Sequence, residues 1–133
     1  MRIIKHIYIL IFCILSINCS VSKKIANADG AVIVKELKST KEMLDEPERS
    51  RLSITLLDQE DSLPLKTYIK LLVNNIQFLP DSGQKFNLNF FSGRYFFQAI
   101  GLGYDKKNFK LFVDEKYNYK ISVKLNPNKT TYN

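Results

Sequence analysis

The residues from Lys85 to Tyr104 constrain the fold more than any other part of this 133-residue chain. Apolar and polar residues alternate over residues 86–90, and this period of two places apolar side chains on one face of a strand. Residues 94–100 are rich in aromatic and β-branched types, and a Gly-x-Gly sequence ends them at a typical strand length. The pattern predicts two strands. Because Ser92-Gly93 suits a tight turn, we expect the strands to pair as an antiparallel hairpin.

Five further segments have the length and alternation of strands, at residues 52–56, 67–73, 76–79, 109–113 and 117–125. Seven short strands separated by turn residues predict an all-β fold, a seven-stranded antiparallel β-sandwich. We expect its core to contain Phe86, Leu88, Tyr95, Ile121 and Val123. The phenylalanines that we assign to the core are Phe78, Phe86, Phe90, Phe91, Phe96, Phe97 and Phe109.

The N-terminus has the pattern of an export signal. Arg2 and Lys5 precede an apolar run at residues 7–15 that is too short to span a bilayer as a helix. Cys19 follows, and small polar and basic residues come after it. This arrangement resembles the lipobox of bacterial lipoproteins, which implies a signal peptide at residues 1–18 and a fatty acyl group such as palmitate on Cys19. A signal cut elsewhere, with a free Cys19, is the alternative.

Removal of the signal peptide changes the chemistry that the chain can perform. His6 is the only histidine, and it leaves together with Cys13. Zinc sites of Cys and His, and Ser-His-Asp triads, then lack essential members. A Ser-Lys pair, such as Ser92 with a lysine, is the remaining arrangement that could supply a catalytic nucleophile, and no motif supports it. The carboxylates of residues 58–62 lack the calcium-loop pattern. We therefore expect no enzymatic activity, no cofactor and no metal.

The charge of the mature chain is modest. Loss of Arg2 and Lys5 lowers the net charge from +7 to +5. A value of this size does not indicate a nucleic-acid partner.

The chain divides into regions of different composition. Residues 20–50 carry six basic and six acidic residues and no aromatic residue. Such a segment buries little apolar surface, so we expect a lipidated cysteine and flexible tether at residues 19–50, although residues 32–34 and 39–44 have weak strand and helix patterns. A folded domain at residues 51–126 and a C-terminal tail at residues 127–133 follow.

Short motifs run through the predicted domain in a fixed order. They are Asp58, Leu63-Pro64-Leu65, Asp81-Ser82-Gly83, Phe86 with Leu88, Gly93 with Tyr95, and Gly103-Tyr104. Their order and spacing resemble the carboxypeptidase regulatory-like domain, a small transthyretin-like (prealbumin-like) β-sandwich that is common in exported and surface proteins of Bacteroidota. The resemblance covers about residues 52–125. It implies a non-catalytic accessory module.

The lipid anchor, the flexible tether and the β-sandwich domain together predict a non-enzymatic interaction or scaffold module of the cell envelope. We expect it on the outer membrane, held through the lipid on Cys19 and bound to an envelope protein. The alternative is a sugar- or peptide-binding surface module of a nutrient-uptake or secretion system, because sheet edges can accept strands and tyrosines can stack on sugars.

Overall fold

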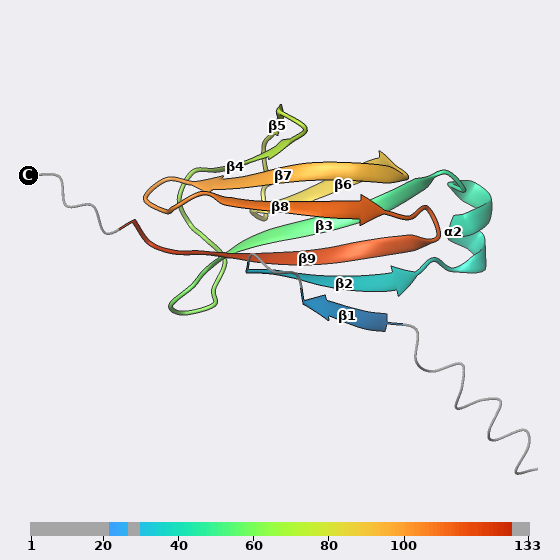
Figure 1. Ribbon diagram of the computed structural model, residues 1–133, viewed down its shortest axis with the longest axis horizontal. Helices are drawn as coiled ribbons and strands as arrows, with labels where there is room; N and C mark the ends of the chain where they lie inside the picture. The colour runs from blue at the N-terminus through green and yellow to red at the C-terminus, as the bar shows by residue number, and fades with distance from the viewer. Residues whose placement is uncertain (1–21, 27–29, 129–133) are drawn as a thin grey trace, which may run out of the picture.

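The computed structural model describes residues 22–26 and 30–128 of the chain. These residues form nine strands and one short helix, and the strands make two sheets that pack face to face (Figure 1). The prediction of an all-β sandwich is therefore confirmed. The expected signal peptide at residues 1–18 and the expected lipid on Cys19 lie outside the described residues.

The first sheet has five strands, in the order β1 (Ser22–Ala26), β2 (Ala31–Leu37), β9 (Tyr117–Leu125), β3 (Arg49–Asp58) and β6 (Lys85–Phe91). Its pairs are antiparallel except β3 and β9, which run parallel. The prediction of a purely antiparallel sandwich is wrong at this pair. Because β2 and β3 run in opposite directions on either side of β9, β9 must be parallel to one of them.

The second sheet has four strands, all antiparallel, in the order β5 (Ile76–Phe78), β4 (Ile69–Val73), β7 (Gly93–Gly101) and β8 (Lys107–Val113). The seven strands predicted between residues 52 and 125 correspond to β3 through β9. Alternation of apolar and polar residues, together with the aromatic and β-branched types of residues 94–100, was therefore sufficient to locate them.

The predicted hairpin between β6 and β7 does not form. β6 pairs with β3 in the five-stranded sheet, whereas β7 pairs with β4 and β8 in the four-stranded sheet. The chain crosses between the sheets at Ser92, and Gly93 adopts a φ of 153°, which favours glycine. The Tyr95 hydroxyl donates a hydrogen bond to the Phe91 carbonyl at 2.8 Å across this crossing. Strands in opposite sheets can direct their apolar faces at each other, which a hairpin cannot do.

The segment predicted as a tether at residues 19–50 contributes ordered elements. β2 pairs with β9 along its whole length, and its Ala31 and Ile33 are buried. Helix α2 (Thr40–Asp45) follows, and the Ser39 hydroxyl caps it by accepting the Glu42 N–H at 3.2 Å. The start of the folded domain at residue 51 is thus corrected to an earlier position. Small and β-branched residues with a period of two were enough to form a strand without any aromatic side chain.

The predicted C-terminal tail also begins later than expected. Pro127 forms a bridge with Tyr104, and the Asn128 N–H donates to the Gly103 carbonyl at 2.8 Å. Residues 127 and 128 therefore belong to the fold. Residues 129–133 lie outside the described part of the chain.

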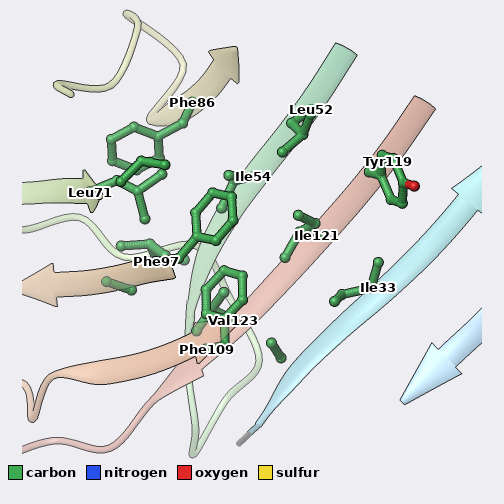
Figure 2. Close-up of a cluster of buried hydrophobic side chains, with 14 of the residues drawn as sticks. Ile33, Leu52, Ile54, Leu71, Phe86, Phe97, Phe109, Tyr119, Ile121 and Val123 are labelled. Carbon is green, nitrogen blue, oxygen red and sulfur yellow. The ribbon is translucent and has the colours of Figure 1, made fainter. Parts of the chain in front are cut away.

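The core lies between the two sheets (Figure 2). Leu52, Ile54 and Phe86 point into it from the five-stranded sheet. Phe97 and Phe109 point into it from the four-stranded sheet, with their rings stacked at 4.8 Å between centroids. Burial of these large apolar side chains is the main favourable contribution to the stability of such a domain.

Most of the core prediction is confirmed. Phe86, Ile121 and Val123 are buried, and Leu88 and Tyr95 are partly buried against the core. Among the phenylalanines, Phe97 and Phe109 are buried, and Phe78 and Phe90 pack against the core. The assignment is wrong for Phe91 and Phe96, which are exposed on the outer faces of the sheets.

Candidate interaction surface

The outer face of the four-stranded sheet gathers apolar and basic side chains. Cross-strand partners share a face, so Arg94 lies beside Phe112, and Phe96 lies beside Lys110. The alternate residues of β7 and β8 face the core. The outward residues that we call the aromatic–basic face are Lys70, Leu72, Arg94, Phe96, Ile100, Lys110 and Phe112.

Two phenylalanines dominate this face. The exposed fraction is 40% for Phe96 and 60% for Phe112. They line a groove of about 410 Å³, whose other lining residues are Asn74, Arg94, Tyr95, Lys110 and Leu111. A groove with aromatic and cationic walls can hold an apolar side chain beside an acidic group.

The turn between β4 and β5 fixes one rim of the groove. The Asn74 N–H donates to the Phe96 carbonyl, and the Asn74 side-chain oxygen accepts the Phe96 N–H, both at 2.9 Å. Asn74 has a φ of 48°, in the left-handed region that asparagine tolerates better than most residues. Phe96 is therefore held on a rigid backbone.

The charge of the four-stranded sheet has one sign. Its strands carry Lys70, Arg94, Lys107 and Lys110, and no aspartate or glutamate stands in β4, β5, β7 or β8. Aromatic residues and arginine are also the types enriched in the centres of protein interfaces. The composition of this face thus suits a partner with an apolar patch and acidic groups.

A second surface feature lies at the opposite end of the sandwich from α2, between the loops. It is an open hollow of about 770 Å³ lined by residues 63–68 and 82–84. Tyr68 is 60% exposed there. The Gln84 side-chain amide donates to the Leu65 and Thr67 carbonyls at 3.2 and 3.1 Å, and the buried Leu65 side chain fixes the same loop to the core. The hollow presents an aromatic ring on a well-held loop.

Asp58 and Tyr104, two of the motif residues, form a hydrogen bond. The Tyr104 hydroxyl donates to the Asp58 carboxylate at 2.6 Å. This bond lowers the pKa of Asp58, and it raises the pKa of Tyr104 to about 12. Because Asp58 ends β3 and Tyr104 follows β7, the bond ties one sheet to the other.

Asp81 holds the turn that precedes β6. One of its carboxylate oxygens accepts the N–H groups of Gly83 and Lys85 at 2.9 and 3.0 Å. The other accepts the Asn87 side-chain amide at 2.8 Å. With Tyr95 at the crossing between sheets, the motif residues stabilise turns and connections.

The other sites considered from the sequence were a nucleophilic serine and a metal-binding group of carboxylates. Ser92 is exposed in the link between β6 and β7. Within residues 22–26 and 30–128, no group of three or more His, Cys, Asp or Glu residues could hold a metal ion. No helix in the described part of the chain is long and apolar enough to cross a membrane.

No family model matches this chain, and no curated protein matches it in sequence. The resemblance to the carboxypeptidase regulatory-like domain accordingly stays a prediction.

The aromatic–basic face was not predicted from the sequence, because its phenylalanines were assigned to the core by their hydrophobicity and not by their place in the alternation. Phe96 stands between Tyr95 and Phe97, which both face inward, so the period of two directs it outward with Arg94 and Gln98. The same reasoning places Phe112 outward with Lys110. Polar residues two positions away were the signal that identified these rings as exposed.

Proposed function

We propose that this protein is a non-enzymatic interaction module of the cell envelope. A lipid on Cys19 holds it to the outer membrane, and the aromatic–basic face binds its protein partner. One observation carries the proposal, namely that Phe96 and Phe112 stand exposed beside Lys110 and Arg94 on a sheet without carboxylates. The resemblance to a regulatory-like accessory module supports the same class of function.

The energetics of this face favour binding. Fully burying an exposed phenylalanine side chain contributes about 1.5–3 kcal/mol, and Phe96 and Phe112, at 40% and 60% exposed, can each gain a corresponding part of that on docking. A rigid sheet also loses little conformational entropy when a partner docks. The backbone of Phe96 is already fixed by its two hydrogen bonds to Asn74. The two rings can therefore act as anchors of an interface.

The basic residues define the charge of the partner. Lys70, Arg94 and Lys110 surround the aromatic rings, and like-charged surfaces are rejected at such a site. The partner is an envelope protein with an apolar patch bordered by aspartate or glutamate.

Photo-crosslinking in intact cells tests this function. A photoreactive amino acid replaces Phe112 in one strain and Thr55, on the outer face of the five-stranded sheet, in a control strain. We expect a defined protein adduct from position 112 and none from position 55. Equal adducts from both positions, or none from either, would contradict the proposal.

A sugar-binding module is the second candidate, and the hollow around Tyr68 favours it. An exposed tyrosine ring can stack on a sugar, and Thr67, Ser82 and Gln84 supply polar groups nearby. Binding to cell-wall glycans that is abolished by Tyr68→Ala and unaffected by Phe112→Ser would favour this candidate over a protein partner.

A further inference from the structure

Because β1 already belongs to the five-stranded sheet, only a short link separates the proposed lipid on Cys19 from the sandwich. β1 begins at Ser22, which pairs with Glu36 of β2. Cys19 and Ser22 are three residues apart, so a fully extended chain separates them by at most about 11 Å. A tether extending to residue 50 would have allowed a far larger separation.

The point where this link joins the fold lies near one end of the molecule. Glu36 precedes Leu37, the last residue of β2, and α2 follows after two residues. Figure 1 shows α2 closing this end of the sandwich, with the start of β1 on the same side. A lipid on Cys19 therefore brings the bilayer close to α2.

This end of the molecule exposes apolar side chains. The exposed fraction is 47% for Leu37, 37% for Met43 and 77% for Leu44. None of the six residues of α2 is buried. The neighbourhood is held by polar contacts instead, since the Asn118 amide donates to the Glu42 carboxylate and the Lys38 ammonium donates to the Glu46 carbonyl at 2.7 Å.

We propose that the α2 end of the sandwich rests on the bilayer, with Leu37, Met43 and Leu44 in the lipid surface. The inference rests on the proposed lipid at Cys19. Apolar side chains that gain nothing from the core gain free energy when they enter the interface of a membrane held within reach.

Charge attraction does not drive this contact. Residues 38–49 carry three basic residues, Lys38, Lys41 and Arg49, against four acidic ones, Glu42, Asp45, Glu46 and Glu48, so this segment has no excess of basic charge to attract anionic lipids. The short link and the apolar side chains bring the surfaces together. The contact is consequently insensitive to salt, unlike adsorption through basic residues.

The experiment uses the mature, full-length lipoprotein in liposomes of bacterial lipids. A fluorophore is attached through Leu44→Cys, or through Leu102→Cys as the matched control, since Leu102 is 69% exposed at the opposite end. The only native cysteines are Cys13, in the proposed signal peptide, and Cys19, whose sulfur would carry the proposed lipid. Each probe therefore has a single position.

We expect a quencher attached to lipid head groups to quench the probe at position 44 severalfold more strongly than the probe at position 102. Insertion of about twenty Gly and Ser residues after Ser20 gives the link a root-mean-square reach of about 25 Å and should reduce this difference. High salt should leave the difference unchanged.

Mass spectrometry of Cys19 shows whether a negative result means that the lipid is absent or that the orientation on the membrane is wrong. If Cys19 carries no lipid, the anchor in the proposed function is wrong, and the membrane contact falls with it. If Cys19 carries lipid and both probes are quenched equally with the native link, the orientation alone is wrong.

Discussion

The outer faces of the two sheets differ, although their inner faces form one core. On the five-stranded sheet, Lys120 pairs with Glu36 at 3.3 Å, and the Asn118 side chain accepts the Arg51 N–H at 3.0 Å. On the four-stranded sheet, Phe96 and Phe112 are exposed among basic residues. Polar groups of the first face thus bond to one another within the molecule, whereas the second face leaves apolar side chains exposed.

Even the exposed ring of the five-stranded sheet is partly covered. The Arg49 guanidinium lies 4.7 Å from the centre of the Phe91 ring, which shields one side of it. Net charge would not have revealed this difference, because both sheets are basic. The location of a binding surface depends on which side chains the fold leaves without neighbours.

The largest effect should separate inward from outward phenylalanines of the same sheet. Phe97→Ala should lower the free energy of unfolding by roughly 3–5 kcal/mol, because its buried ring packs against Phe109. Phe112→Ala should change the free energy of unfolding by no more than about 0.5 kcal/mol. Urea denaturation measures both values, and similar losses in the two variants would remove the distinction.

The next effect concerns whether β2, in the segment expected to be a tether, contributes to the core. Ile33→Ala should cost roughly 2–5 kcal/mol, because Ile33 is 2% exposed in the core. Lys41→Ala, at an exposed position of α2, serves as the control with an expected change within about 0.5 kcal/mol. If Ile33→Ala and the wild-type protein have the same midpoint of urea unfolding, β2 does not contribute to the core.

A smaller effect concerns the bond between the sheets at Asp58 and Tyr104. The pKa of Tyr104 is raised from 10.0 to about 12, so its contribution to stability is complete below pH 10 and is lost as the pH rises through 12. The pKa of Asp58 is lowered from 3.8, so its contribution is complete above pH 3.8 and is lost at lower pH.

Ultraviolet absorbance titration of the tyrosines measures this bond. Tyr104→Phe should remove a transition near pH 12 and leave the other tyrosines unchanged. Tyr68→Phe is the control, because Tyr68 is exposed. An unaltered high-pH transition in Tyr104→Phe would show that the hydrogen bond does not form in solution.

The smallest effect lies on the outer face of the five-stranded sheet. Lys120→Ala should lower the free energy of unfolding by less than about 1 kcal/mol, because the side chains of Lys120 and Glu36 are 68% and 41% exposed. The loss should shrink in high salt. A larger loss that persists in salt would mean that this face depends on its ion pair for stability.

The sequence allowed the strands to be located but did not determine how they pair. Alternation at residues 117–125 and 86–90 reports which side chains share a face, and β9 and β6 confirm it. Alternation is the same whether neighbouring strands join one sheet or two, so the crossing at Ser92 was not predictable from it. Only the packing of both inner faces decides between these arrangements.

Composition misled the prediction in two places. The absence of aromatic residues from residues 20–50 suggested a tether, but Ala31 and Ile33 are small enough to fill the space beside β9. The abundance of phenylalanine suggested a larger core, but Phe96 occupies a position of β7 whose side chain points away from the core. The site was consequently missed because its residues resembled core residues by type.

Lysine acylation in intact cells tests the central claim most directly, because it compares the two outer faces without knowledge of the partner. The rate at each lysine is measured by mass spectrometry and divided by the rate in the purified protein. We expect Lys70 and Lys110, on the aromatic–basic face, to react several times more slowly in cells, and Lys120 and Lys124 to react at unchanged rates. Equal protection of both faces, or protection of Lys120 and Lys124 alone, would contradict the claim that the four-stranded sheet binds the partner.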